Sequence, residues 1–398
     1  MSISSVELLS RVDAISDVIV KHRAQAEHNA ELSNAVVQAL HSSGLTNLYL
    51  PRALGGLEAA PLAVAEAVEA VARLDTAAAW MLMVANVPRF LASTWPAELV
   101  DEVWGNAPNA LAAISGNQTF SATPCDGGYR VSGHTGFASG CNHAQWFITP
   151  ARIEDPAHPR TVAGPDSAAA PGPKRGMLLL RMADCEVVPN WDVLGMRGTG
   201  SHDVRATDLF VASRYLVRFG PGSTVNRYYT GPLYRCARRV VFATYVPISL
   251  AVAERGLAAL SALAESKLPY ASEQTLKHRA LAQHKFGRAL ALYRSGRLYF
   301  HDALARAMAD AEGGTVPSER QRADLYLASV QAVQSAAEAL RLVADAAGTS
   351  IIYAQSPFER LVRDMEVLRQ HGFTSDNRYA NVAQVYWGAT LDYPALLL

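Results

Sequence analysis

Two segments in the middle of the chain place hydroxyl and amide groups beside glycines, where they could bind a ligand. In the first, Phe137–Trp146 (FASGCNHAQW), Ser139 follows a strand-like run and is expected at a turn. The second, Trp191–Val204 (WDVLGMRGTGSHDV), is a glycine-punctuated loop whose hydroxyls and amides suit an anionic or heteroaromatic ligand. On the residues alone a plain turn serine is the favoured interpretation of the first segment, and a solvated hairpin explains the second as well as a ligand site does. The residues alone therefore leave both interpretations open.

His371 is a third candidate for chemistry. It ends a charged helical pattern, ERLVRDMEVLRQH, and precedes Gly372, a residue typical of helix C-terminal caps. The helix dipole stabilises a histidine there without any further role, and Arg363 and Asp364 in the same pattern predict a structural ion pair. An imidazole can also act as a general base near neutral pH. A capping role and a catalytic role both remain open.

Several common catalytic signatures are missing. GMRGTGSHD (195–203) lacks the third glycine of GxGxxG, and no GxxxxGK[ST] occurs, so a dinucleotide-binding Rossmann domain is not expected. GFASG (136–140) places its serine one position late for the nucleophile elbow GxSxG. The eleven histidines form no HExxH, and no cysteine pairs locally with another metal ligand. We expect no metal site.

Composition narrows the class of partner. The 398 residues carry 36 Lys plus Arg against 36 Asp plus Glu, and only 18% are charged, which argues against nucleic-acid binding. The uncharged stretch 240–253 is too short for a membrane-spanning helix, and acidic and basic residues interrupt the N-terminal apolar pattern. Four widely spaced cysteines indicate a reduced compartment. We expect a cytoplasmic protein with a small-molecule partner and no membrane contact.

Three segments with different periodicity must position these residues. Helical spacing of apolar residues runs through 1–113, short alternating runs fill 114–215, and helical spacing returns over 216–398. We take these as an N-terminal α-helical domain, a β domain and a C-terminal helical bundle, with an exposed excursion at 155–175. The helical blocks expected in the bundle are 238–267, 273–312, 318–347, 358–370 and 377–390.

Five stretches resemble the acyl-CoA dehydrogenase superfamily, and within it the two-component (group D) flavin-dependent monooxygenases. They are LSNAVVQALHSSGLTNLYLPRALGG (32–56), VARLDTAAAW (71–80), GGYRVSGHTGFASGCNHAQW (127–146), WDVLGMRGTGSHDV (191–204) and PFERLVRDMEVLRQH (357–371). The resemblance implies an α+β, mostly α fold, with an N-terminal helical domain, a middle β-barrel or sandwich domain and a C-terminal four-helix-type bundle.

The choice of branch depends on the segment after the RD pair. Dehydrogenases of the superfamily generally carry a catalytic glutamate about eight residues further on, whereas this chain reads RQHGFTSDN and has His371 near that place. Histidine here is the monooxygenase pattern. Some dehydrogenases take their base from another helix, so an acyl-CoA dehydrogenase with FAD and a non-standard base remains an alternative. A flavin-binding relative without turnover is another.

By this resemblance the chain binds reduced flavin, FMNH2 or FADH2, and uses O2 through a C4a-hydroperoxyflavin to oxygenate a small aromatic or heteroaromatic substrate. Ser139 would bond the flavin N5 and C4a edge and, with His371, be catalytic. His371 would act as general base on a phenol or indole, because an imidazole pKa near neutrality suits that task. The remaining implied flavin contacts are Asn117, Phe137, Ala138, Thr199, Ser201, Arg279, Gly348, Thr349 and Ser350.

The resemblance also implies partners. An NAD(P)H-dependent flavin reductase would supply the reduced flavin, and a neighbouring subunit of a homotetramer (a dimer of dimers) would close the flavin site with Arg279 and Gly348–Ser350. One departure concerns the substrate side of the site. Many relatives carry a histidine on the helix after the AAW motif, whereas WMLMVANVPRFLAST (80–94) has none, which leaves Asn86 or Arg89 to take its place.

Overall fold

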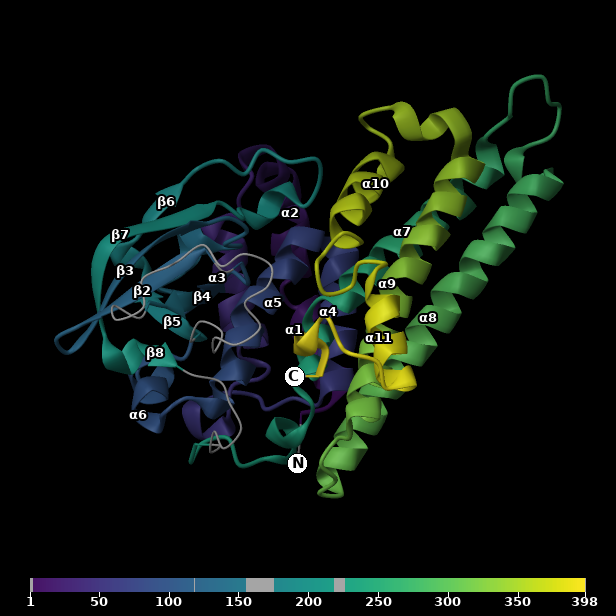
Figure 1. Cartoon of the computed structure of the whole chain (residues 1–398). Helices are drawn as coiled ribbons and strands as arrows, with labels where there is room; N and C mark the ends of the chain where they lie inside the picture. Colours follow the sequence, from purple (N-terminus) through teal and green to yellow (C-terminus); the bar gives the residue numbers. More distant parts are fainter. Residues whose placement is uncertain (1–2, 118, 155–174, 218–225, 398) are drawn as a thin grey trace, which may run out of the picture.

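The computed structural model describes residues 3–117, 119–154, 175–217 and 226–397. In space, the N-terminal helices lie between a β-sheet on one side and the long C-terminal helices on the other (Figure 1). This arrangement confirms the predicted α+β class and the order of helices, sheet and bundle along the chain. The domain bounds at residues 113 and 215 stay a prediction. Most of the excursion predicted at 155–175 lies outside the described residues.

Capping side chains begin α1, α3 and α5, and a proline begins α4. Pro61 opens α4 at a position where its missing N–H costs nothing, and the Asp75 carboxylate caps α5 by accepting from the Ala78 N–H at 2.8 Å. Ala-rich faces of α4 and α5 are almost wholly buried. The bounds are α1 Ser5–Asp13, α2 Ser16–Asn29, α3 Asn34–Ser42, α4 Pro61–Leu74, α5 Thr76–Leu91 and α6 Ala97–Val100.

The middle strands pair in the order β6-β7-β3-β2-β4-β5-β8, and β1 pairs with β4. β3 and β7 run antiparallel with Thr135 opposite Val204, so the end of β3 and the start of β7 meet at one edge. Both predicted ligand-binding segments emerge from that edge. The bounds are β1 Ala112–Ile114, β2 Phe120–Cys125, β3 Gly128–Thr135, β4 Trp146–Ile153, β5 Arg175–Arg181, β6 Glu186–Val188, β7 Asp203–Ala212 and β8 Leu216–Val217.

The C-terminal helices pack closely where their residues are small. A Cβ on Gly296 of α8 would lie 3.1 Å from the Ser335 Cβ of α9, and one on Gly256 of α7 would lie 2.5 Å from Leu340. The block expected at 273–312 begins later, because a turn of 3-10 helix precedes α8, and 238–244 is also 3-10 helix. The α-helices are α7 Val246–Ser266, α8 Ala280–Glu312, α9 Glu319–Ala347, α10 Pro357–Leu368 and α11 Arg378–Trp387.

A buried ion pair fixes the bundle to the N-terminal helices. The Glu69 carboxylate of α4 is 1% exposed and accepts from Nε and Nη2 of Arg297 of α8 at 2.8 Å each. Burial raises the pKa of Glu69, although the arginine opposes that rise. Because breaking a buried pair leaves an uncompensated charge, this contact holds α8 in register on α4.

One helical segment, Arg238–Ser266, is long and apolar enough to cross a membrane by length and composition. In the fold, 61% of its most apolar window is buried against other parts of the protein. Core helices of soluble proteins pass the same test, so this single segment is weak support for a membrane span.

Candidate functional site

The two segments that the sequence singles out are bonded to each other at the sheet edge. The Ala138 N–H donates to the His202 carbonyl at 3.1 Å, and the Gly140 N–H donates to the Thr199 carbonyl at 3.0 Å. Gly140 has φ +70°, a left-handed conformation in which a Cβ is disfavoured, so this glycine lets the first loop turn back onto the second. The loops therefore form one rigid unit.

Three almost fully buried hydroxyls form a hydrogen-bonded chain between these loops. Ser139 Oγ lies 2.7 Å from Ser201 Oγ, which lies 2.7 Å from Thr199 Oγ1. Thr199 Oγ1 in turn donates to the Met196 carbonyl at 2.8 Å. The structure thus brings together three of the residues expected at the flavin, and it bonds the Thr199 and Ser201 hydroxyls within the protein.

Trp80, at the end of the VARLDTAAAW stretch, joins the hydroxyl chain to His371. Its Nε1 donates to Ser139 Oγ at 3.0 Å, and its ring lies edge-on to the His371 ring with centroids 5.6 Å apart. The spacing of residues in the sequence gives no role for this tryptophan. The one sequence signal for this tryptophan is that it ends a stretch that resembles the family. Its contact with His371 could not be predicted, because α5 and the segment after α10 are far apart in sequence.

Aromatic rings surround His371 on several sides. Besides Trp80, the rings of Tyr245 and Phe373 lie 5.1 and 5.2 Å from its ring. Burial among them lowers the pKa of His371 from 6.5 to about 4. The expectation of an imidazole pKa near neutrality is therefore wrong, because these apolar surroundings disfavour the charged form and no carboxylate offsets that penalty.

The Nδ1 atom of His371 faces the backbone that follows it. The Phe373 N–H donates to His371 Nδ1 at 3.5 Å, a long contact. A neutral imidazole that accepts at Nδ1 carries its proton on Nε2. His371 then presents an N–H donor to a ligand, and with a pKa of about 4 it is a weak base at neutral pH.

Asp364 holds the second loop in place. Its carboxylate is 1% exposed and accepts from the Met196 N–H and the Thr76 hydroxyl, each at 2.6 Å, and lies 3.4 Å from Arg360. The predicted ion pair between Arg363 and Asp364 is wrong. Arg363 instead contacts Glu359 and Glu27, because neighbouring residues on a helix point in different directions.

Phe137 offers an apolar face beside the hydroxyl chain. It is 65% exposed, has φ +62° and meets the Trp191 ring edge-on at 5.8 Å. Ala138, next to it, is buried. Asn117 is exposed two residues after Ser115, whose hydroxyl donates to the Gly136 carbonyl at 2.8 Å where the first loop begins.

The residues expected at the flavin phosphates lie at one end of the bundle. Arg279 precedes α8 and is exposed, and Thr349 is exposed after α9. Lys267, which the sequence analysis did not single out, donates from Nζ to Ser350 Oγ at 2.8 Å. Gly348 has φ +56°, and the Lys267 Nζ lies 3.6 Å from where its Cβ would be. A lysine beside a hydroxyl and a tight glycine turn suits a phosphate group.

The sequence leaves Asn86 or Arg89 to take the place of the histidine that this chain lacks. Both side chains are fully buried, and both donate hydrogen bonds to backbone carbonyls. Asn86 donates to the Leu45 and Leu82 carbonyls, and Arg89 donates to the carbonyls of Pro108 and Ala110. These bonds use the side chains to hold α5 to neighbouring segments, although the buried Arg89 Nε has no hydrogen-bond partner among the described residues.

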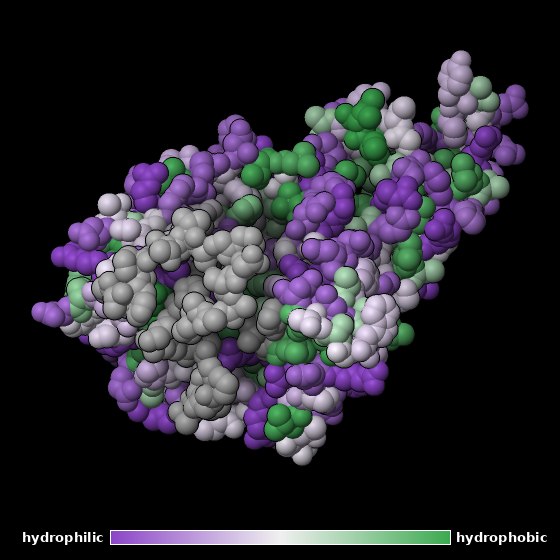
Figure 2. Space-filling view, viewed as in Figure 1, coloured by the Kyte–Doolittle hydropathy of each residue, from purple (hydrophilic) through white to green (hydrophobic). Residues whose placement is uncertain are grey.

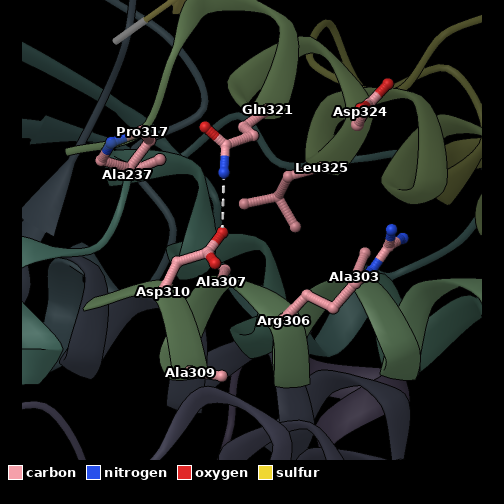
Figure 3. Close-up of a pocket in the computed structure, with 10 residues that line it drawn as sticks. All are labelled: Ala237, Ala303, Arg306, Ala307, Ala309, Asp310, Pro317, Gln321, Asp324 and Leu325. Carbon is pink, nitrogen blue, oxygen red and sulfur yellow. Dashed lines mark hydrogen bonds between the residues drawn. The ribbon is translucent and has the colours of Figure 1, made fainter. Parts of the chain in front are cut away.

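A separate groove of about 290 Å³ lies between α8 and α9 (Figure 3). Asp310 faces it from α8 and accepts from Gln321 Nε2 of α9 at 2.9 Å, with Leu325 between the two helices. None of the site residues named above lines it. Within the described ranges, no three His, Cys, Asp or Glu side chains are grouped so that they could hold a metal ion.

Family models match both helical regions of the chain. The acyl-CoA dehydrogenase N-terminal domain model matches residues 9–91, and the acyl-CoA dehydrogenase C-terminal domain model matches residues 243–376. Together the two models span more than half of the 398 residues. The chain belongs to the acyl-CoA dehydrogenase family. The resemblance on which the sequence analysis depended is confirmed.

Relatives within the family are oxygenases. The chain is 28% identical over 367 residues to an indole-3-acetate monooxygenase of Pseudomonas putida, covering 91% of this chain and 89% of that one. It is 30% identical over 232 residues to the oxygenase component of an FADH2-dependent resorcinol hydroxylase of a Rhizobium species, covering 58% and 53%. XiaF from a Streptomyces species, solved with FADH2 and glycerol, has the same fold, with a TM-score of 0.89, 22% identity and coverage of 98% and 97%.

Proposed function

We propose that this member of the acyl-CoA dehydrogenase family is the oxygenase component of a two-component flavin-dependent monooxygenase that oxygenates a small aromatic or heteroaromatic substrate. The observation that carries the proposal is the position of Trp80, which bonds Ser139 on one side and packs on His371 on the other. A flavin edge at Ser139 and a substrate at His371 would be neighbours across this indole. The oxygenase relatives support the same reaction class.

The residues at the sheet edge fit a flavin ring. An isoalloxazine needs an apolar surface for its face and hydrogen-bonding groups for its edge. Phe137 supplies the exposed apolar surface, and Ser139 and the adjacent backbone supply the edge. Asn117 would contact the same ring from the neighbouring loop. When bound, reduced flavin would supply the two electrons that activate O2, so that one atom of O2 enters the substrate and the other leaves as water.

The phosphate-bearing tail of the flavin would reach the end of the bundle of a neighbouring subunit. Arg279 and the Gly348–Ser350 turn are our proposed contacts, and Lys267 joins them because its Nζ already bonds Ser350. Cations and hydroxyls together suit a phosphate.

His371 would bind and orient the oxygen-bearing group rather than remove a proton. Its half-buried ring is neutral above about pH 4 because desolvation among the aromatic rings has lowered its pKa, so at working pH it offers Nε2–H as a donor. The rings of Tyr245 and Phe373 would exclude water from that hydrogen bond. The same rings provide an apolar wall against which a flat substrate can stack.

The subunit arrangement we propose is a homotetramer. Of the 33 residues of α8 only eight are buried, whereas 16 of the 29 residues of α9 are. Leu281 and Leu298 on α8 are 67% and 72% exposed, and apolar residues are scattered along the bundle surface in Figure 2. A second copy covering α8 would remove these side chains from water. Light scattering should give four times the 42.8 kDa chain mass, and a monomer would contradict the arrangement.

An NAD(P)H-dependent flavin reductase would supply the reduced flavin as a separate protein, and the cytoplasm would be the site of action. The four cysteines are free thiols, as in a reducing compartment.

The reaction class is tested by supplying reduced flavin without a reductase. The protein is mixed anaerobically with FMNH2 or FADH2 and with indole-3-acetate or resorcinol as probe, and 18O2 is then admitted. One labelled oxygen atom in the organic product supports the proposal. Oxidation of flavin with only hydrogen peroxide formed, for every probe, would count against it. Bleaching of bound FAD by an acyl-CoA in the absence of a reductant would establish the dehydrogenase alternative instead.

A further inference from the structure

The hydrogen bonds of the hydroxyl chain between the two loops all donate in one direction, from Ser139 towards Thr199. We propose that Thr199 sets this direction and so leaves the Ser139 hydroxyl able only to accept a hydrogen bond from a ligand. Such a hydroxyl selects reduced over oxidised flavin. Thr199 then acts as a positioning residue, since it works through Ser201 and Ser139. The inference rests on the proposed function, because it needs the flavin N5 at Ser139.

The direction follows from counting hydrogens along the chain. A hydroxyl has one proton, and a carbonyl can only accept. Thr199 Oγ1 therefore donates its one proton to the Met196 carbonyl at 2.8 Å. Because Thr199 has no second proton, Ser201 must be the donor in the 2.7 Å contact between Ser201 Oγ and Thr199 Oγ1. Ser201 has no second proton, so Ser139 donates to Ser201 at 2.7 Å. Each bond is satisfied in this one arrangement only.

Ser139 is left with acceptor capacity alone. Its proton is committed to Ser201, and one lone pair receives the Trp80 Nε1–H at 3.0 Å. Any further ligand at this oxygen must donate a hydrogen bond. Because the three hydroxyls are nearly fully buried, water cannot readily substitute for a missing partner.

Reduced and oxidised flavins differ at the atom proposed to lie here. N5 carries a hydrogen in reduced flavin and donates, whereas in oxidised flavin it has only a lone pair and accepts. The N5–H of reduced flavin can donate to Ser139 Oγ. The N5 of oxidised flavin would instead face Ser139 Oγ with no proton between the two atoms, because both are acceptors. An unsatisfied buried polar group costs enough to shift binding by roughly tenfold or more. The site would thus retain the flavin while it is reduced and release it once oxidised.

Replacing Thr199 by valine tests this direction. The Thr199→Val side chain has nearly the same shape but no hydroxyl, and the Met196 carbonyl still accepts from the residue-199 N–H at 3.1 Å and from Trp191 Nε1 at 3.3 Å. Ser201 can then turn its proton to Ser139, which frees the Ser139 proton for the ligand. Affinity for oxidised flavin should rise relative to that for reduced flavin.

The measurement is the ratio of Kd for oxidised flavin to Kd for dithionite-reduced flavin, obtained by anaerobic equilibrium dialysis with FMN and with FAD. We expect a ratio of roughly ten or more for the unmodified protein, falling several-fold in Thr199→Val. Thr199→Ser keeps the hydroxyl and should restore the original ratio. Thr149→Val is the matched control, because Thr149 Oγ1 is buried in β4 with no hydrogen-bond partner among the described residues.

The outcomes separate this inference from the function on which it rests. A ratio unchanged in Thr199→Val, with both flavin forms still bound, overturns the role of Thr199 and leaves the oxygenase proposal standing. Failure of the unmodified protein to bind either flavin form overturns both. Should Thr199→Val not fold, as judged by its melting curve, Ser201→Ala answers the same question, because it also releases the Ser139 proton. An unchanged ratio there overturns the inference equally.

Discussion

The indole of Trp80 donates to Ser139 Oγ at 3.0 Å while its ring stands edge-on to His371 at 5.6 Å. One side chain from α5 thereby touches the loop of the β-sheet and the segment after α10. Neither contact depends on the other, since the first uses the N–H and the second uses the ring. Substitutions can therefore separate them.

Trp80→Phe should weaken flavin binding without unfolding the protein. The phenyl ring keeps an aromatic contact with His371 but removes the donor to Ser139, a loss of about 1 kcal/mol or roughly fivefold in Kd for reduced flavin. Trp95→Phe is the control, because Trp95 Nε1 is buried and no described residue bonds it. Dialysis of both variants with FMNH2 and FADH2 checks the difference. Equal Kd values for the two variants would contradict a role for the Trp80 N–H.

His371→Ala should lower the yield of oxygenated product per reduced flavin by at least about tenfold while flavin still binds, because the imidazole donor among the aromatic rings is lost. In the unmodified protein we expect no titration of His371 between pH 6 and 8, since burial holds its pKa at about 4. Product yield measured across that range checks this. An inflection near pH 6.5 that disappears in His371→Gln would show that the ring titrates in its ordinary range.

Acid should destabilise the fold through its buried histidines. Burial, with Arg297 as a lesser cause, lowers the pKa of His301 from 6.5 to about 4. The unfolded chain then takes up this proton below pH 6.5 and the folded chain does not until about pH 4. The free energy of unfolding therefore falls between those values, by up to about 1.4 kcal/mol per pH unit for this group.

Urea unfolding of His301→Gln at pH 7 and pH 5 measures that contribution. The variant should lose less stability on acidification than the unmodified protein does. His284→Gln, an exposed position on the same helix, should behave like the unmodified protein. The same loss in all three proteins would exclude His301 as a source of the acid sensitivity.

Asp364→Asn should destabilise the protein by about 3 kcal/mol. The change removes one of the three carboxylates that compensate Arg360, beside Asp75 and Glu27, and weakens the bonds to the Met196 N–H and the Thr76 hydroxyl. Glu366→Gln, in an exposed pair with Arg369 on the same helix, should cost less than about 1 kcal/mol. Urea midpoints compare the two. Similar losses would mean that the Asp364 contacts contribute little.

Gly195→Ala should weaken the contact between the second loop and α10, in which the Asp364 carboxylate accepts from the Met196 N–H. An added Cβ would lie 2.2 Å from the Arg363 carbonyl oxygen, so the loop or α10 must shift, at a cost of about 1–3 kcal/mol. Gly287→Ala, in the interior of α8 with nothing within 4 Å, should instead stabilise by about 0.5–1 kcal/mol. Thermal melting of the two variants should move in opposite directions. A raised melting temperature for Gly195→Ala would refute the tight approach.

The sequence by itself determined the class of fold and the location of the two loops. Helical and alternating apolar spacing follow directly from the geometry of helices and strands, so the order of helices, sheet and bundle could be predicted. The family resemblance lay in short stretches, and the family models confirm it. Ser139, Thr199 and Ser201 stand within two of those stretches, which is why they could be named before their contacts were known.

Only the tertiary structure decided what these residues can do. The sequence could not predict the pKa of His371. The fold packs the rings of Trp80, Tyr245 and Phe373 around this histidine and thereby lowers its pKa, so that the imidazole is neutral. The bond from Thr199 to the Met196 carbonyl lies within one loop, but Ser139 joins the hydroxyl chain only because the fold brings its Oγ to 2.7 Å from Ser201 Oγ, 62 residues further along the chain. Sequence spacing reports periodicity along one element, whereas desolvation and hydrogen-bond polarity arise between elements.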